Sequence, residues 1–164
     1  MSTYLVVLDG ARADSEVQAS LAQIRERDAE ARFTVLVPAD RRRDISEGES
    51  WLDAAQRANE ALETLKSQAL DVSEAVVGDF MRRKAISEEL RRAEHAYDEV
   101  LLFTTPFRAG MDVNRLVPSD IAVQLERRHR VPVRHTEVGR RDPIQPRISR
   151  RLLIQKYEAL SRRN

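Results

Sequence analysis

Short apolar runs alternate along the chain with stretches in which apolar residues recur every three or four positions. Nearly continuous runs are typical of strands that are buried on both faces of a parallel sheet. The helical spacing between them predicts a helix in each interval. The alternation therefore predicts an α/β fold, a five-stranded parallel sheet with helices on both faces. The strands are expected at residues 4–8, 33–37, 73–77, 99–103 and 131–138.

Each predicted helix carries an apolar stripe that we expect to face the sheet. Ser119 precedes the last of these stripes and is the expected N-cap of that helix. Pro132 lies inside the fifth run, which favours an edge position for that strand. The four stripes are Val17, Leu21 and Ile24; Trp51, Ala55, Ala58, Leu62 and Leu65; Ile86, Leu90, Ala93 and Tyr97; and Ile121, Ala122 and Leu125.

The chain changes character after Val138. Gly139, Pro143 and Pro146 interrupt it, and a last helical pattern then spaces Leu153, Tyr157 and Leu160 on one face. We therefore divide the sequence into an α/β domain, residues 1–138, and a C-terminal extension with a helix, residues 139–164.

Charge separates the extension from the domain. The net charge of the 164 residues is +1, but residues 140–164 hold 8 of the 28 Lys and Arg residues and only 2 of the 27 Asp and Glu residues. A basic tail with an apolar face predicts docking on protein, either on the acidic domain or on a protein partner. A solvated extension and a nucleic-acid-binding arm are the alternatives; we expect no nucleic-acid partner.

Several classes of protein find no support in the sequence. The chain has no cysteine, no apolar run long enough to cross a membrane, and no basic segment followed by an apolar core at its start. We expect a cytoplasmic protein without a membrane contact. It also lacks the G-x-S-x-G, Walker and G-x-G-x-x-G patterns, and its three histidines are not at a zinc-binding spacing. We expect no catalytic residues and no metal.

"YLVVLDG" opens the chain with a run that ends in Asp-Gly, and it resembles the first strand of the universal stress protein family. "ALDVSEAVVGDFMRRKAISEELRRAEHAYDEVLLF" is similar to the third strand, the Gly-Asp turn, the helix and the fourth strand. "LVPSDIAVQLERRHRVPVRHTEV" is similar to the last helix and the last strand. The resemblance covers residues 3–138 and implies a strand order of 3-2-1-4-5 and a homodimer that forms through the last strand.

Members of the family that bind ATP use a loop after the fourth strand, with glycines at G-x-x-G, then nine further residues, and then Gly-Ser. On this sequence the glycines fall on Thr105, Arg108 and Pro118, and only Ser119 is kept. Side chains at the first two positions obstruct the approach of phosphate to the backbone, and proline removes an N–H donor. No cofactor is therefore expected, although ATP is kept as an alternative ligand.

The resemblance also implies residues for the base. Asp9 matches an aspartate near the nucleotide base, and Val7, Val37 and Thr104 fall where binding members line that pocket.

Arginines offer another way to hold an anion. Arg108, Arg115 and the run 41–43 are expected near the same strand ends, where guanidinium groups would bind phosphate in place of backbone amides.

The sequence supports two hypotheses for the function. The first is a non-enzymatic stress-response or regulatory protein of the universal stress type that does not bind ATP in the family manner. The alternative is a nucleotide-binding sensor or weak ATPase with an arginine-built phosphate site.

Overall fold

The computed structural model describes residues 1–40, 46–92, 97–106 and 118–139, with only the backbone described at 118 and 119. Five parallel strands form one sheet in the order β3-β2-β1-β4-β5, which confirms the predicted fold class and strand order. The predicted helix of the C-terminal extension lies outside the described residues. The elements are β1 (Thr3–Asp9), α1 (Ser15–Arg27), β2 (Arg32–Pro38), α2 (Glu47–Ser67), β3 (Val72–Gly78), α3 (Arg82–Arg92), β4 (Glu99–Thr104), α4 (Pro118–His129) and β5 (Val133–Glu137).

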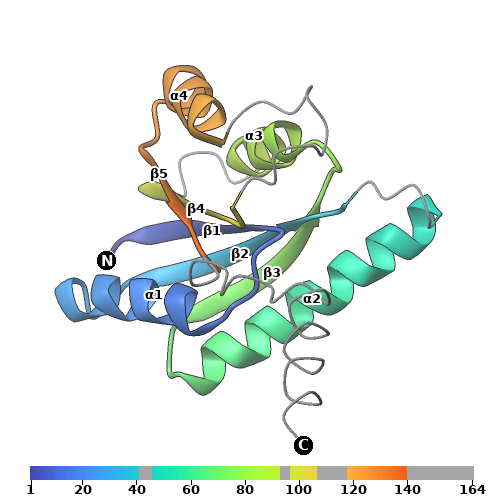
Figure 1. The fold of residues 1–164 in the computed structure, drawn as a ribbon. Coiled ribbons are helices and arrows are strands. Elements are labelled where there is room, and N and C mark those ends of the chain that lie inside the picture. Colours follow the sequence, from blue (N-terminus) through green and yellow to red (C-terminus); the bar gives the residue numbers. More distant parts are fainter. Residues whose placement is uncertain (41–45, 93–96, 107–117, 140–164) are drawn as a thin grey trace, which may run out of the picture.

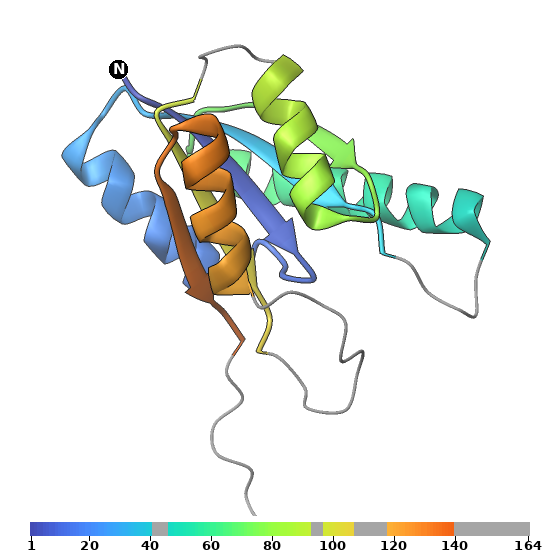
Figure 2. The same cartoon turned by 90° about the horizontal axis from the view of Figure 1, so that it is seen from above.

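Helices cover both faces of the sheet. Helices α1 and α2 lie on one face, and α3 and α4 lie on the other (Figures 1 and 2). The sequence of β1 is almost continuously apolar because alternate side chains of the strand enter two different cores. Val6 and Leu8 pack in the core under α1 and α2, whereas Leu5 and Val7 pack in the core under α3 and α4.

The buried faces of α1 and α4 are the ones that the apolar stripes predicted. The predicted residues of both stripes are buried.

Helix α1 begins after Asp14, whose carboxylate accepts hydrogen bonds from the backbone N–H groups of Glu16 and Val17. This side chain satisfies donors that the first turn of a helix leaves without partners.

The predicted face of α2 is wrong in part. Ala58 and Leu65 are buried as expected, but Trp51 is 37% exposed, and its ring meets Phe80 edge-on with the ring centroids 5.7 Å apart. The face toward the sheet is lined mostly by small residues, which let the helix approach closely. Those buried residues are Ser50, Ala54, Ala58, Ala61 and Leu65.

The start of α4 also differs from the prediction. The helix begins at Pro118, so Ser119 lies in its first turn and is not the N-cap. Proline suits this first position because its fixed φ matches the helix and its missing N–H would have no intrahelical partner there.

The edge position of β5 is confirmed. The strand begins at Val133, two residues later than predicted, and the carbonyl of Pro132 accepts a hydrogen bond from the backbone N–H of Val100 at 2.8 Å. Proline thus precedes the strand and takes part only as an acceptor.

Among the described residues, no helix is long and apolar enough to span a membrane.

Candidate functional site

The carboxyl ends of β1 and β4 meet at the centre of the sheet. Asp9 pairs in register with Thr104, and Gly10 continues into a bridge with the same threonine. Gly10 has φ of +69°, a left-handed conformation that favours glycine. From here β1 leads to α1 on one face and β4 leads toward α4 on the other face. Parallel α/β sheets commonly bind ligands at such a switch point.

Asp9 is engaged within the protein. Its carboxylate lies 2.7 Å from the Nη1 of Arg82, the first residue of α3, and both side chains are mostly buried. An ion pair at this depth is costly to break, because the carboxylate that remains is desolvated without its partner. The predicted base-recognition residue therefore already has a cationic partner.

Thr104 is also engaged at this edge, and Thr105 follows it in an exposed position. The buried hydroxyl of Thr104 lies 2.8 Å from the Nε2 of His135 on β5. The hydroxyl oxygen of Thr105 lies 3.4 Å from the place where a Cβ on Gly10 would stand. The hydroxyl of Thr104 thus already has a partner within the protein.

The other predicted site residues are only partly visible. Arg108, Arg115 and residues 41–43 lie outside the described residues, and only the backbone of Ser119 is described. Val37 is buried at the end of β2. The structure thus brings Asp9, Thr104 and Thr105 together at one edge, and it places Val37 one strand away in a different setting.

The Gly-Asp turn after β3 has a structural role. Asp79 accepts hydrogen bonds from the backbone N–H of Met81 at 2.9 Å and from the Nζ of Lys84 at 2.6 Å. The bond from Lys84 is the main cause that lowers the pKa of the Asp79 carboxyl, and the bond from Met81 adds to it. The ionised carboxylate therefore fixes the start of α3.

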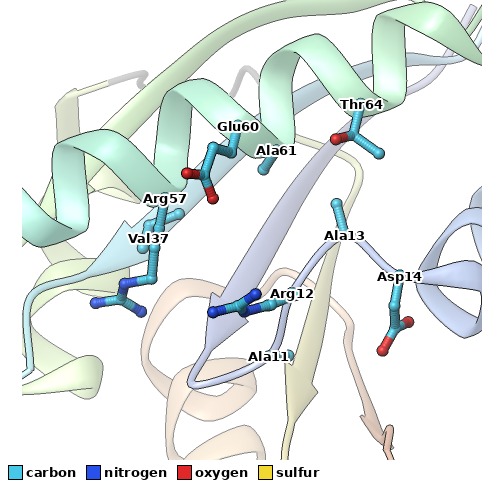
Figure 3. Close-up of a pocket in the computed structure, with 9 residues that line it drawn as sticks. All are labelled: Ala11, Arg12, Ala13, Asp14, Val37, Arg57, Glu60, Ala61 and Thr64. Carbon is cyan, nitrogen blue, oxygen red and sulfur yellow. The ribbon is translucent and has the colours of Figure 1, made fainter.

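A cavity of about 260 Å³ lies between the loop that joins β1 to α1 and the side of α2 (Figure 3). Of the predicted site residues that the structure describes, Val37 is the one that lines it. The lining consists of Ala11, Arg12, Ala13, Asp14, Val37, Arg57, Glu60, Ala61 and Thr64.

Two arginines give this cavity its chemistry. The side chains of Arg12 and Arg57 both line it, together with the carboxylates of Asp14 and Glu60 (Figure 3). The Nε of Arg57 donates to Asp53 at 3.0 Å, whereas its Nη2 is buried and has no hydrogen-bond partner within the described part of the chain. Sequence reasoning missed both residues, and the one signal for Arg57 was its place among the small residues of α2, four positions before Ala61.

Among the described residues, no group of three or more His, Asp or Glu side chains is arranged to hold a metal ion.

Comparisons with known proteins point to one fold. No family model and no curated protein matches the sequence. A solved structure of a universal stress protein in complex with cAMP superposes with a TM-score of 0.55 at 14% identity, over 84% of this chain and 98% of that one. This chain has the fold of the universal stress proteins.

A second solved structure supports the same conclusion. A protein of the universal stress protein family from Burkholderia pseudomallei superposes with a TM-score of 0.51 at 13% identity, over 82% of this chain and 95% of that one. The predicted resemblance to universal stress proteins is thus confirmed as a fold. Identities this low carry no residue roles from those proteins to this chain.

Proposed function

We propose that this protein is a non-enzymatic regulatory protein of the universal stress type that does not bind ATP in the family manner. The observation that carries the proposal is the ion pair between Asp9 and Arg82 at 2.7 Å. The carboxylate that the resemblance assigns to the nucleotide base is held by a cation of the protein itself. A base that used this carboxylate would have to displace the guanidinium of Arg82.

The loop after β4 supports the proposal from the sequence side. Thr105 and Arg108 replace glycines of the family motif, and Pro118 replaces the third and starts α4. Each missing backbone donor to a phosphate removes about 1.5–3 kcal/mol of binding free energy. Two or three such losses lower the affinity by several orders of magnitude.

A nucleotide-binding sensor, or a weak ATPase, is the second candidate. It is favoured by one specific observation, that a solved protein with this fold is in complex with cAMP. In this chain such a site would use the side chains of Arg108 and Arg115, and replacing both with alanine is then expected to abolish the binding.

The protein partner of the basic tail and the cytoplasmic location stay predictions.

Material purified from cells tests the proposal. We expect mass spectrometry of the denatured protein to find no adenine nucleotide in stoichiometric amount, because the engaged Asp9 and the altered loop leave too little binding free energy to retain one. The cAMP-binding universal stress protein, loaded with cAMP and carried through the same procedure, is the positive control. Stoichiometric ATP or AMP in this protein would favour the sensor.

We also propose a homodimer through β5. This strand is an edge of the sheet, and an exposed edge presents unpaired backbone groups that invite a second strand. Val131 and Val133 are only partly buried against the core beneath α3 and α4, so a partner strand would cover them further. Light scattering at micromolar concentration is expected to give twice the chain mass. A species of 18.8 kDa alone would rule the dimer out.

A further inference from the structure

We propose that the outer flank of α2 is the docking surface for residues 149–161 of the same chain. The outer flank is the side of α2 that carries Trp51, Ala55 and Leu62, which follow one another at helical spacing. The occupant is the predicted helix of the C-terminal extension, whose residues lie outside the described part of the chain. The inference uses no residue of the family's ATP site, so it goes beyond the function proposed above.

The outer flank faces away from α1 and toward an edge of the sheet. The opposite side of α2 carries Arg57, Glu60 and Thr64, which line the cavity beside the loop that leads into α1. The ring of Trp51 instead contacts the ring of Phe80, which follows β3. Among the described strands, β3 is the last at this end of the sheet.

Apolar side chains at this flank are incompletely covered. Trp51 is 37% exposed, and the other two residues of the flank are only partly buried. Leu52 and Met81 follow Trp51 and Phe80 in the chain and are 73% and 61% exposed. Of the five large hydrophobic side chains that are exposed among the described residues, three thus lie at or beside the contact of Trp51 with Phe80. Such a gathering is typical of a contact site, whereas isolated exposed residues are ordinary.

The edge strand β3 extends this apolar surface. Helix α2 packs on β3 (Figure 1), and Ala75 and Val77 of the strand are only partly buried against the core beneath α1 and α2. A helix that lay along the outer flank would therefore cover apolar surface of both α2 and β3.

Residues 149–161 have the pattern of such a helix. Leu153, Tyr157 and Leu160 are spaced so that a helix places all three on one face. A helix of this length is marginal in water by itself, because its few hydrogen bonds do not offset the cost of forming the first turn. Contact between its apolar face and the outer flank would supply the missing stabilisation.

Charge favours this segment over a second copy of α2. Helix α2 holds five Asp and Glu residues and two Lys and Arg residues, whereas residues 140–164 hold two and eight. Opposite net charges bring the segment toward the helix, although each exposed ion pair adds little. Two copies of the chain that docked through the same flank would instead place two acidic helices side by side.

The chain between the domain and the segment is long enough to reach the flank. All five strands are parallel, so β5 and β3 end at the same edge of the sheet. Four strand spacings of roughly 4.8 Å, about 19 Å in total, separate the two ends. The thirteen residues from 140 to 152 span up to about 40 Å when extended, at roughly 3.3 Å each.

Fluorescence of the full chain tests the docking, because Trp51 is the one tryptophan in the sequence and lies on the proposed surface. The test variant combines Leu153→Asp with Leu160→Asp, which puts two charges on the apolar face of the segment. We expect its emission to shift to the red relative to the wild type, and acrylamide to quench it more strongly. The reason is that the indole of Trp51 regains contact with water when the segment leaves.

Gln155→Asp combined with Ala159→Asp is the matched control. These changes add the same two charges to the opposite face of the predicted helix. The emission and the quenching of Trp51 should then match those of the wild type. Circular dichroism of each variant checks that the α/β domain is folded.

A mixture of two variants shows whether the segment docks on its own chain. Trp51→Phe, with an intact segment, is unfolded together with the Leu153→Asp and Leu160→Asp variant, and the two are refolded. Every tryptophan then belongs to a chain whose own segment cannot dock. We expect the emission to stay shifted to the red. A return to the wild-type emission would mean that the segment docks on a second copy, which overturns the inference.

Two further outcomes would overturn it. Unchanged emission and quenching in the variant of Leu153 and Leu160 would show that the segment does not cover Trp51. Equal shifts in this variant and in the matched control would assign the effect to charge alone. None of these results depends on ATP, so the inference and the proposed function fail or stand separately.

Discussion

Replacing Phe103 with alanine is expected to lower the free energy of unfolding by about 3–5 kcal/mol. Phe103 lies on β4, is 2% exposed, and stands in register between Leu8 of β1 and Thr136 of β5. It packs in the core beneath α1 and α2. The change removes an aromatic ring from a rigid central strand, where the neighbours cannot close the space. Urea denaturation followed by circular dichroism measures the loss.

Val123→Ala on α4 is the matched control. This side chain is 46% exposed, so its truncation is expected to change stability by less than about 0.5 kcal/mol. A loss below about 1 kcal/mol for Phe103→Ala would mean that the packing around β4 is looser than described. Phe103 also precedes Thr104, so this variant reports how firmly the core supports the edge near Asp9.

Replacing Glu89 with alanine is expected to cost about 2–3 kcal/mol of stability. Glu89 lies on α3 and is 5% exposed. Its Oε1 accepts the hydroxyl of Tyr97 at 2.7 Å, and its two oxygens accept Nη2 and Nε of Arg92, each at 2.9 Å. Arg92 also reaches Glu74 on β3 at 3.0 Å, so the group links α3 to the edge of the sheet.

Tyr97 explains why this loss is large. Burial is the main cause that raises the pKa of Tyr97 to about 12, so its hydroxyl stays a donor at neutral pH. Without Glu89 that buried donor loses its carboxylate. Chemical denaturation of Glu89→Ala, Tyr97→Phe and the double variant measures the coupling, and the double variant should cost less than the two single changes together.

Glu88→Ala is the control for Glu89. The Glu88 side chain is 48% exposed and lies 3.8 Å from Lys84, so its removal is expected to change stability by less than about 0.5 kcal/mol. Equal losses for the two variants would show that burial and the contacts of Glu89 contribute nothing specific.

The strands were the most predictable part of the fold. A run such as Leu5 to Leu8 is apolar at every position because its side chains enter two cores, and few other structures require that pattern. The buried face of helix α2 was harder to predict. Trp51 and Leu62 have larger apolar side chains than alanine, but close packing against the sheet buries Ala54 and Ala61, which the predicted stripe left out.

The candidate site also combines residues that sequence reasoning found with contacts that it could not find. Asp9 and Thr104 are the last residues of neighbouring parallel strands, so topology brings them together, and the family resemblance pointed to both. The pairing of Asp9 with Arg82 depends on where α3 begins in space, which no local pattern specifies. The burial of the Arg57 Nη2, which has no partner among the described residues, depends on the depth of one atom, and a sequence contains no measure of depth.

At the edge where β1 meets β4, the side chains of Asp9 and Thr104 are held by contacts within the protein. A nucleotide that used them in the family manner would have to displace Arg82 and His135, so this feature argues against ATP there.

Calorimetric titration of the full chain with ATP and magnesium tests the central claim most directly. The account predicts a dissociation constant weaker than roughly 0.1 mM, which corresponds to less than about 5.5 kcal/mol of binding free energy. The ion pair of Asp9 and the replaced glycines at Thr105, Arg108 and Pro118 are the reasons. Micromolar binding with one ATP for each chain would contradict it.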